Sequence, residues 1–347
     1  MEIGIDSFAI ASRVGQAVTP AGSAKHLDHL LREITLADEA GFHVFGVGEH
    51  HRQEFLDSAP PVILAAAAAL TKRIRLTSAV TVLSAADPVR VFQEFATLDL
   101  LSKGRAEMVV GRGSSIEAFP LFGYKLEDYD ELYEEKLDLL LKIRDKASIH
   151  WSGKFRPALT GQGVYPRPLQ DPLPIWRGVG GSPESFLRAG QRGLPLMIAI
   201  IGGETRRFRQ LVDLYYEAGE RAGHPRESLK VGLHVIGYVA KTGDKAVEDF
   251  YPAYAQTMNG FGKERGFPFF GRAQFDAYRA KEGSLFVGSP GEIVEKVLHQ
   301  SRELGGISRL TFQLSLAETA LPHEKIMESI GLIGKEVIPA LRSQANI

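Results

Sequence analysis

The chain has 347 residues, of which 44% are hydrophobic and 24% are charged, and its 41 basic residues nearly balance its 42 acidic residues. This ordinary globular mixture excludes a disordered chain or a coiled coil, and the balanced charge gives no electrostatic footprint for nucleic acid or an anionic membrane. Cysteine is absent, so disulfides, thiolate metal sites and cysteine nucleophiles are excluded.

The beginning of the chain has no features of a targeting segment. Glu2 and Asp6 stand where a signal peptide needs positive charge followed by an apolar run. The longest uncharged stretch, residues 58–71, is shorter than the roughly 20 residues that a membrane span needs, and it contains two prolines. We therefore expect a cytoplasmic protein with no membrane partner.

Short β-branched segments alternate with amphipathic helical segments in the first part of the chain. Strands are predicted over 1–8, 43–48, 74–83 and 106–111, and helices over 24–40, 59–71, 88–102 and 129–143. Ser23 is the expected N-cap of the first helix, and Gly41 is its expected end. The strand over 74–83 is apolar throughout, which is typical of a buried parallel sheet.

The alternation pauses and then resumes. Residues 145–174 are rich in glycine and proline, with a tight turn near 150–155, and predict an excursion from the repeating pattern. Strands follow over 174–181, 194–201, 229–240 and 309–315, with helices over 183–192, 205–222, 290–304 and 322–342. Residues 244–286 predict a second excursion, helical and aromatic.

Eight strand signals, nearly all followed by a helix, predict one α/β domain over 1–347, a (β/α)8 TIM barrel with insertions after its fourth and seventh strands. A doubly wound sheet is the alternative, but the turn after the first strand lacks the glycine-rich G-x-G-x-x-G pattern, and no Walker A sequence occurs.

Chemistry in a barrel is expected where the strands end. The turn of Gly180, Gly181 and Ser182, with Ser185 one helical turn later, offers backbone N–H groups and hydroxyls to a phosphate. Equally, Ser182 is an ordinary N-cap before Pro183. Arg112, between Gly111 and Gly113, would bind the same phosphate, with the glycines letting a flat ring approach; alternatively it pairs with a neighbouring acid.

The sequence Glu49-His50-His51 follows the second strand. Side chains alternate along a strand, so the two histidines are expected to point to opposite sides, and Asp6 and His234 are the only further candidates for a metal site. We therefore predict no metal and assign His50 to proton handling, with a structural histidine as the alternative. No lysine stands at a strand end, which disfavours a Schiff base. A phosphate clamp, a glycine-lined slot and one histidine suit flavin mononucleotide (FMN).

The chain resembles the luciferase-like flavin-dependent monooxygenases, the superfamily of the bacterial luciferase α chain. The resemblance is carried by residues 37–51 (ADEAGFHVFGVGEHH), 75–113, 176–186 (WRGVGGSPESF) and 330–342. Gly111 stands where the luciferase proper has a cysteine, so light emission is not expected.

The resemblance implies noncovalent FMN at the barrel mouth. It implies that His50 is the catalytic histidine, that Arg112, after Gly111, binds the phosphate, and that Ser78 and Ala79 meet the ring, sometimes through a cis peptide bond. Gly180, Gly181, Ser182 and Ser185 match the second phosphate loop. The family also suggests a homodimer through the helices over 59–71 and 88–102. The alanine run 65–69 would let two helices approach closely, although it would equally pack onto the barrel.

The function implied is a monooxygenase in which a separate flavin reductase supplies reduced FMN and oxygen reacts through a C4a-hydroperoxyflavin with an unidentified small organic substrate. An aromatic lid is expected to exclude water, drawn from Trp151, Phe155, Trp176, Phe261, Phe269 and Phe270. The alternatives are an oxidoreductase of the same fold that uses the deazaflavin F420, a metal-dependent barrel hydrolase using His50, His51 and Asp6, and a flavin-binding protein without turnover.

Overall fold

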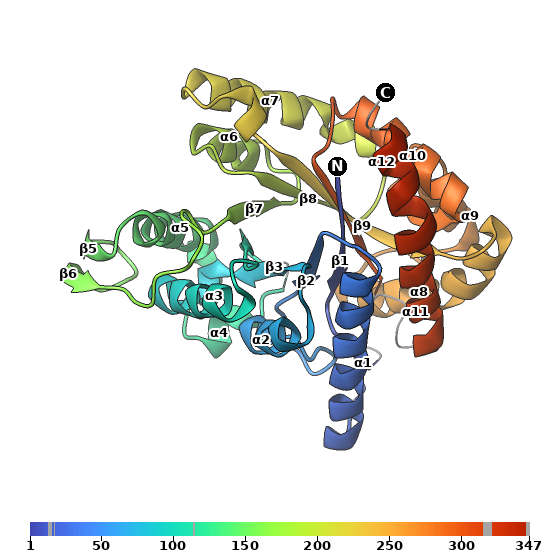
Figure 1. The fold of residues 1–347 in the computed structure, drawn as a ribbon, viewed down its shortest axis with the longest axis horizontal. Helices are drawn as coiled ribbons and strands as arrows, with labels where there is room; N and C mark the ends of the chain where they lie inside the picture. Colours follow the sequence, from blue (N-terminus) through green and yellow to red (C-terminus); the bar gives the residue numbers. More distant parts are fainter. Residues whose placement is uncertain (13–15, 17, 114, 315–320, 345–347) are drawn as a thin grey trace.

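The computed structural model describes residues 1–12, 16, 18–113, 115–314 and 321–344. In this part of the chain, eight parallel strands form a closed barrel surrounded by helices, which confirms the predicted fold (Figure 1). In ring order the barrel strands are β1 (Glu2–Ser7), β2 (Val44–Val47), β3 (Arg75–Val82), β4 (Met108–Gly111), β7 (Ile175–Val179), β8 (Leu196–Ile200), β9 (Val231–Val239) and β11 (Arg309–Gln313). The pairing of β11 with β1 closes the ring.

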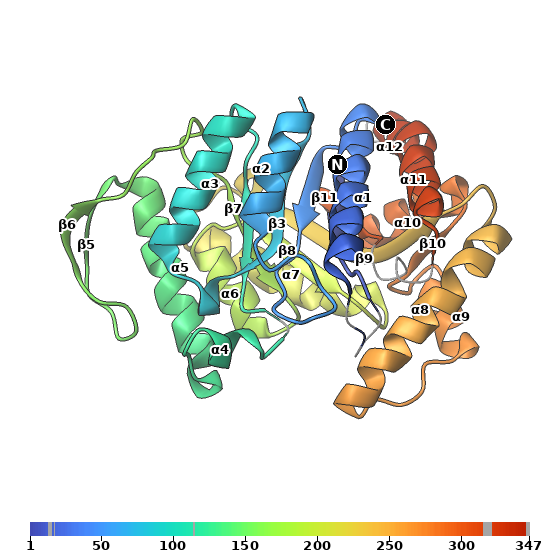
Figure 2. The ribbon, with the colours of Figure 1, turned by 90° about the horizontal axis from the view of Figure 1, so that it is seen from below.

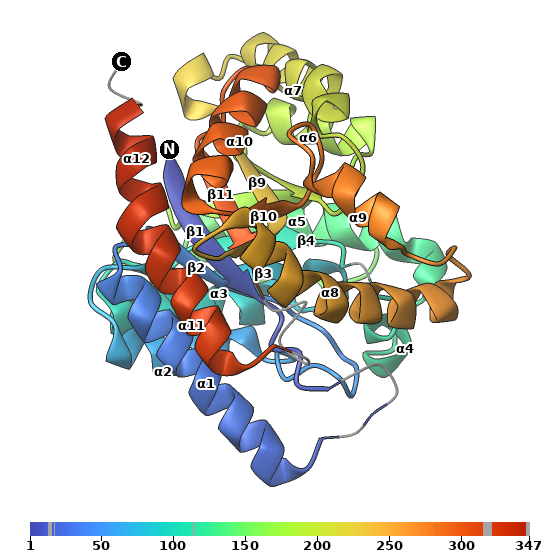
Figure 3. The same ribbon diagram turned by 90° about the vertical axis from the view of Figure 1, so that its right-hand side faces the viewer.

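The helices that follow the strands cover the outside of the barrel. They are α1 (Pro20–Glu39), α2 (Pro60–Leu70), α3 (Pro88–Ser102), α5 (Tyr129–Asp145), α6 (Pro183–Gln191), α7 (Arg209–Arg221), α10 (Pro290–Glu303) and α11 (His323–Leu332). A π-helical turn, Ile333–Val337, joins α11 to the terminal helix α12 (Ile338–Gln344). Helices α1 and α11 lie side by side, so the two ends of the chain meet at the closure of the barrel (Figures 2 and 3).

Local capping chemistry sets where these helices begin. Asp87 accepts hydrogen bonds from the first N–H groups of α3, and Ser289 forms a capping box at the start of α10. The predicted start of α1 was wrong: the helix begins at Pro20, because Thr19 accepts a hydrogen bond from Gly22 N and acts as the cap. Its predicted end before Gly41 agrees with the structure.

The segment after α5 forms a two-stranded antiparallel hairpin, β5 (Ser148–Trp151) with β6 (Leu159–Gly163), at the outer edge of the molecule (Figure 1). The Trp151 ring lies beside the ammonium group of Lys142 in α5, and the Phe155 ring lies beside that of Lys154 in the hairpin itself. The prediction that this segment supplies aromatic residues to a lid is therefore wrong, because the hairpin folds outward.

The segment after β9 contains α8 (Gly243–Arg265), α9 (Arg272–Arg279) and a short strand, β10 (Phe286–Gly288). The sequence did not predict β10, which has only three residues and pairs with Gly237–Val239, beyond the part of β9 that pairs with β8. The short helix α4 (Ala118–Leu121), between β4 and α5, was also not predicted.

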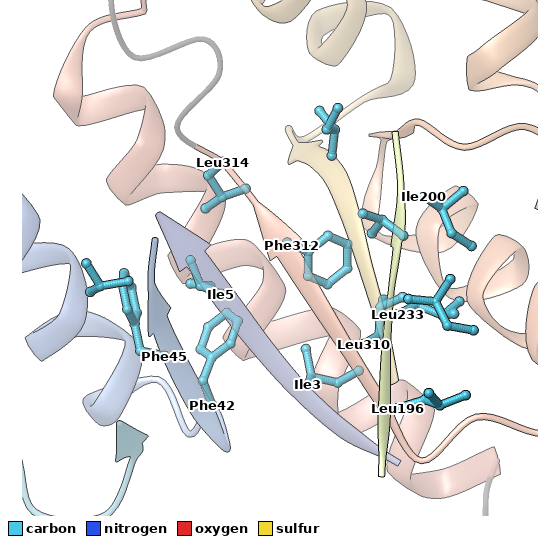
Figure 4. Packing of buried hydrophobic residues seen from close by; sticks show 14 of the residues in the cluster. Ile3, Ile5, Phe42, Phe45, Leu196, Ile200, Leu233, Leu310, Phe312 and Leu314 are labelled. Atoms are coloured by element: carbon cyan, nitrogen blue, oxygen red, sulfur yellow. The ribbon is translucent and has the colours of Figure 1, made fainter. Parts of the chain in front are cut away.

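Apolar side chains fill the space between the strands and the surrounding helices, as the apolar strands predict. Figure 4 shows part of the larger core, in which side chains such as Ile3, Phe45 and Leu233 lie among those of neighbouring strands. A smaller cluster contains Val109, Trp176 and Met197, with Val80 packed against it. Trp176 is therefore a core residue and not part of a lid.

A buried ion cluster joins the beginnings of three strands. Arg309 of β11 forms salt bridges with Glu107 and with Glu2 of β1, and its guanidinium lies 4.1 Å from the centre of the Trp176 ring. Arg309 and Glu107 are almost fully buried. Removing one partner of such a group leaves a buried charge unpaired, which typically costs about 3–5 kcal/mol of stability.

No described helix is long and apolar enough to span a membrane.

We expect Glu2→Gln to lower the free energy of unfolding in a pH-dependent way. Burial works to raise the pKa of Glu2, but Arg309 and Arg75 outweigh it and lower that pKa from 4.5 to about 2. A carboxylate with a lowered pKa stabilises the fold above the ordinary value, and this contribution is lost as the pH falls toward 2. Because Glu2 is 32% exposed, we expect a loss of only about 1–2 kcal/mol at neutral pH.

Urea unfolding at neutral pH and near pH 3 measures the effect. The difference between wild type and Glu2→Gln should narrow at the acidic pH, because protonation of unfolded Glu2 already removes part of the wild-type advantage. An equal difference at both pH values would contradict the assignment.

Candidate active site

A cavity of about 590 Å³ opens at the carboxyl ends of the barrel strands. Its lining includes residues from all eight barrel strands or from the turns that follow them, and Arg309 and Thr77 lie among the lining residues that come from within the strands. This is the end of a barrel at which catalytic residues gather. Of the predicted site residues, the structure brings together His50, Ala79, Gly111, Arg112 and Gly180 in the lining of this one cavity.

His50 is held by a buried carboxylate. Its Nδ1 lies 2.9 Å from Asp57 Oδ2, and its backbone N–H donates to Asp57 Oδ1 at 3.0 Å. Asp57 is fully buried, and burial raises its pKa more than the hydrogen bond from His50 lowers it. The imidazole also contacts the rings of Phe8 and Phe55, with centroid distances of 4.7 and 4.2 Å. These contacts leave Nε2 as the ring nitrogen available to a ligand.

Gly48 makes this arrangement possible. A Cβ at this position would lie 2.6 Å from Asp57 Oδ2 and 2.7 Å from Phe8 Cδ1, closer than real side chains allow. The glycine after β2 therefore leaves the space in which the carboxylate and the aromatic ring meet His50.

His51 points to the other side of the strand end, as the alternation of side chains predicts. Its Nε2 lies 3.0 Å from Glu49 Oε1, and it lines a separate groove between α2 and α3. The second oxygen of Glu49 accepts a hydrogen bond from Val82 N at 2.8 Å. Among the described residues, no three histidine, aspartate or glutamate side chains are grouped in a way that would hold a metal ion.

Arg112 lies at the rim of the cavity and pairs with Asp130, the neighbouring-acid alternative raised by the sequence. Its guanidinium also lies 5.2 Å from the centre of the Tyr129 ring, and the Tyr129 hydroxyl donates to Gly113 O. Asp130 is 71% exposed, and exposed ion pairs of this kind contribute at most about 1 kcal/mol. An incoming anion therefore competes with Asp130 for Arg112 at little cost.

Glycines near Arg112 leave space for side chains of the neighbouring strand. A Cβ at Gly111 or Gly178 would lie within 3.0 Å of a Val80 methyl group, and a Cβ at Gly113 within 3.0 Å of Val82. These glycines make room for valine side chains of β3, so they shape the wall of the cavity. Gly180 differs, because a Cβ there would meet nothing within 4 Å.

The turn after β7 leads from the cavity into α6. Gly180 lines the cavity, whereas Gly181, Ser182 and Ser185 do not. Ser182 occupies the N-cap position but makes no side-chain capping hydrogen bond, and it is exposed. Ser185 is buried, and its N–H donates to Ser182 O at 3.0 Å. Only the start of the predicted phosphate loop therefore faces the cavity directly.

Arg207, in the turn after β8, was not predicted. It lines the cavity, lies against Gly203, and carries its guanidinium 4.9 Å from the centre of the Phe208 ring. None of the described carboxylates lies within ion-pairing distance of it. Its sequence signal was a pair of arginines soon after Gly202 and Gly203 at a strand end. These residues form one edge of the cavity: Arg112, Arg207 and, between them, Gly180. We call this edge the arginine rim.

The cavity-facing residues of β3 are not quite those predicted. Ser78 is fully buried, donates to Val109 O at 2.9 Å and accepts from the Thr81 hydroxyl, and it does not line the cavity. Thr77, Ala79 and Val80 do line it. The cis peptide bond lies between Ala79 and Val80, one residue after the expected pair.

A second histidine–carboxylate pair also lines the cavity. His234 Nδ1 lies 2.7 Å from Asp6 Oδ2, and the Thr311 hydroxyl donates to the same oxygen. From the sequence, Asp6 and His234 were candidates only for a metal site. The available signal was the presence of polar residues inside otherwise apolar strands, which suggests side chains that face the barrel interior.

Comparison with known proteins gives a family match over most of the chain. Residues 7–307 match the model of the luciferase-like monooxygenase family. The chain is 31% identical over 221 residues to the N-acetyl-S-alkylcysteine monooxygenase of Bacillus subtilis, covering 61% of this chain and 62% of that one. It is 26% identical to the alkanal monooxygenase alpha chain of the Kryptophanaron alfredi symbiont, covering 89% and 91% of the two chains.

Solved structures share the fold. The monooxygenase RslO1 of Streptomyces bottropensis superposes with a TM-score of 0.83 at 24% identity, covering 98% of this chain and 99% of that one. The oxygenating constituent of the Pseudomonas putida 3,6-diketocamphane monooxygenase, solved with FMN, gives 0.75 at 21% identity and 98% coverage of both. The F420-dependent tetrahydromethanopterin reductase of Methanopyrus kandleri gives 0.74 at 18% identity, covering 98% and 99%.

Proposed function

The chain belongs to the luciferase-like monooxygenase family, and from this premise we propose that it is an FMN-dependent monooxygenase acting on a small organic substrate. Reduced FMN is the cosubstrate, and a separate reductase delivers it in a transient encounter. The observation that supports this proposal best is the meeting of the arginine rim with the His50–Asp57 pair in one cavity. The cytoplasmic location stays a prediction from the sequence.

The residues of the cavity fit a flavin with a phosphate tail. Gly180 leaves open space beside the start of α6, and Arg112 and Arg207 carry positive charge on the same rim. Helix N-termini and arginine side chains are the usual protein ligands of phosphate. Ala79 and Val80 offer an apolar wall to a flat ring. When bound, reduced flavin would supply the electrons that activate oxygen.

His50 is suited to move a proton at its Nε2 atom. Asp57 fixes the tautomer by accepting from Nδ1, and the flanking rings of Phe8 and Phe55 keep the imidazole from turning. The same rings exclude water from one side of His50. This arrangement holds a proton donor or acceptor at a fixed position in the cavity wall.

The charges around the mouth favour FMN over F420. F420 carries an acidic tail and needs a basic rim, but the described rim of the cavity has two arginines, Arg112 and Arg207, and Arg112 is paired with Asp130. Two rim arginines suffice for one phosphate. An F420-dependent oxidoreductase remains the alternative, since the solved structures that share the fold include F420-dependent enzymes.

The outer groove between α2 and α3 supports the proposed homodimer. It has a volume of about 640 Å³, and apolar residues such as Val62, Ala65 and Leu101 line it. Val62 and Leu101 are 70% and 59% exposed, which is uncommon for a monomer surface when such residues are contiguous. A second copy related by a twofold axis would cover the groove with the same apolar helices.

Arg112→Ala is expected to weaken FMN binding about tenfold to a hundredfold, because a charge-assisted hydrogen bond to phosphate contributes about 1.5–3 kcal/mol. Quenching of FMN fluorescence measures the affinity. Asp130→Asn is the matched control: it removes the competing carboxylate, so binding should be unchanged or tighter. Wild-type protein that binds F420 but not FMN would refute the FMN assignment, and equal affinities of wild type and Arg112→Ala would remove Arg112 from the phosphate site.

His50→Ala is expected to slow turnover about a hundredfold or more, the usual contribution of a positioned proton-transfer group, with little loss of FMN affinity. Reductase-coupled oxygen uptake with test panels of aldehydes and thioethers measures turnover. His51→Ala, on the outer face of the same strand end, should retain most of the activity. A His50→Ala variant that oxygenates at the wild-type rate would show that the assignment is wrong.

Leu101→Glu is expected to convert the dimer to a monomer, because it would place like charges in the covered groove. Light scattering coupled to size-exclusion chromatography measures the mass. Leu169→Glu, at another exposed leucine (60% exposed), serves as the control and should stay dimeric. A monomeric wild-type protein would end the dimer proposal.

A further inference from the structure

The cavity has a second polar end, where Asp6 and Thr311 lie on the barrel wall opposite Arg112 and Gly180. Arg112 and Gly180 follow β4 and β7, whereas Asp6 and Thr311 belong to β1 and β11. In the ring order, β11 lies four places from β4, and β1 lies four places from β7, so these strands face each other across the barrel. A ligand phosphate at Arg112 and Gly180 would therefore lie far from the Asp6 carboxylate. Arg207 follows β8, which pairs with β9, the strand that carries His234.

The residues at this second end form an oriented histidine. Asp6, 3% exposed, accepts hydrogen bonds through one oxygen from His234 Nδ1, at 2.7 Å, and from the Thr311 hydroxyl. With Nδ1 engaged, Nε2 is the remaining polar atom of the His234 ring, and the residue lines the cavity. A histidine whose Nδ1 donates to a carboxylate presents Nε2 as a proton acceptor.

Two glycines leave space for the hydrogen-bonded group of Asp6, Thr311 and His234. A Cβ at Gly46 of β2 would lie 2.2 Å from Asp6 Oδ1, and one at Gly4 would lie 3.0 Å from the Thr311 methyl group. Asp6 does not take part in the Arg309 cluster at the other end of β1, so the salt bridges of that cluster do not explain it. A buried carboxylate is costly unless it is paired, and here its two partners are a hydroxyl and the histidine that it orients.

Phe8 separates the two histidine–carboxylate pairs. Its ring lies 4.7 Å from that of His50 and 5.7 Å from that of His234, and it is nearly parallel to His234, at 12°. If His50 serves the cofactor, as proposed above, the second pair faces a different molecule in the same cavity. The neighbouring lining residues Met197, Ala199 and Ile236 are apolar. Polar residues such as Gln313 and Tyr278 also line the cavity, so the site suits a largely apolar molecule that carries a polar group.

We propose that His234 binds and deprotonates an acidic hydroxyl of the substrate, which makes the substrate class an apolar, unsaturated molecule with one enol or phenol group. The O–H bond breaks, the proton moves to His234 Nε2, and the electron pair stays on the substrate oxygen. Asp6, as a positioning residue, stabilises the imidazolium that forms, and the oxyanion pairs with it. The resulting anion is electron-rich and therefore reacts with an electrophilic oxygen donor. This inference rests on the proposed monooxygenase function.

4-Nitrophenol is a direct probe, because its neutral and ionised forms absorb at different wavelengths. At a pH where the free probe is mainly neutral, wild-type protein without cofactor should bind it and shift its spectrum to the phenolate band. 4-Nitroanisole, which has the same ring but no acidic proton, should bind about tenfold more weakly. Equal binding of the two probes, or binding of 4-nitrophenol in its neutral form, would overturn the proposal.

Three variants identify the base. His234→Gln should lose the phenolate band, Asp6→Asn should bind the probe with little ionisation, and His50→Gln, altered at the other pair on the same cavity, should keep the band. Loss of the band in His50→Gln alone would overturn the proposal. The wild-type comparison of the two probes decides the question even if a variant fails to fold. FMN titration of the same samples tests the proposed function independently. If FMN does not bind, the proposed function is refuted, but the phenolate band is not abolished.

Discussion

Two glycines of one short segment leave the space on which the candidate site depends. Gly46, in β2, lies against the Asp6 carboxylate, and Gly48, just after β2, lies against Asp57 and Phe8. A methyl group at either position would occupy the place of a carboxylate oxygen. Each carboxylate in turn orients one histidine toward the same cavity. The absence of side chains at Gly46 and Gly48 therefore matters as much to the cavity as the side chains that β2 supplies.

Charge is distributed unevenly along the axis of the barrel. At the amino ends of the strands, Arg309 is buried with Glu107 and Glu2 in a closed ion cluster. At the carboxyl ends, Arg112 has one exposed acidic partner, and the Arg207 guanidinium lies beside Gly203 and the Phe208 ring. Desolvation explains the difference in role: buried charges need fixed partners and hold the structure together, whereas rim charges are available to an anionic ligand.

The excursions show which parts of the fold could not be predicted from the sequence. Glycine and proline content located the departure between α5 and β7, but no local pattern indicated that the β5–β6 hairpin folds outward. Aromatic residues in such a segment are equally compatible with a lid and with packing against the lysines of α5 and of the hairpin itself, which is where Trp151 and Phe155 lie. Trp176 is also misplaced by the sequence-based prediction, because it is the second residue of β7, at the amino end of that strand, and its ring packs in the core.

The sequence by itself determined the order of the eight barrel strands and of the helices that follow them, the closed barrel and the opposite directions of His50 and His51. These features follow from periodicity, capping residues and the alternation of side chains along a strand, all of which act over a few residues. Only the tertiary structure decided that Asp57 holds His50, that Asp6 holds His234, and that Ser78 turns away from the cavity. Asp6 and His234 are 228 residues apart, and a contact at that separation is set by the closure of the ring, which no local pattern records.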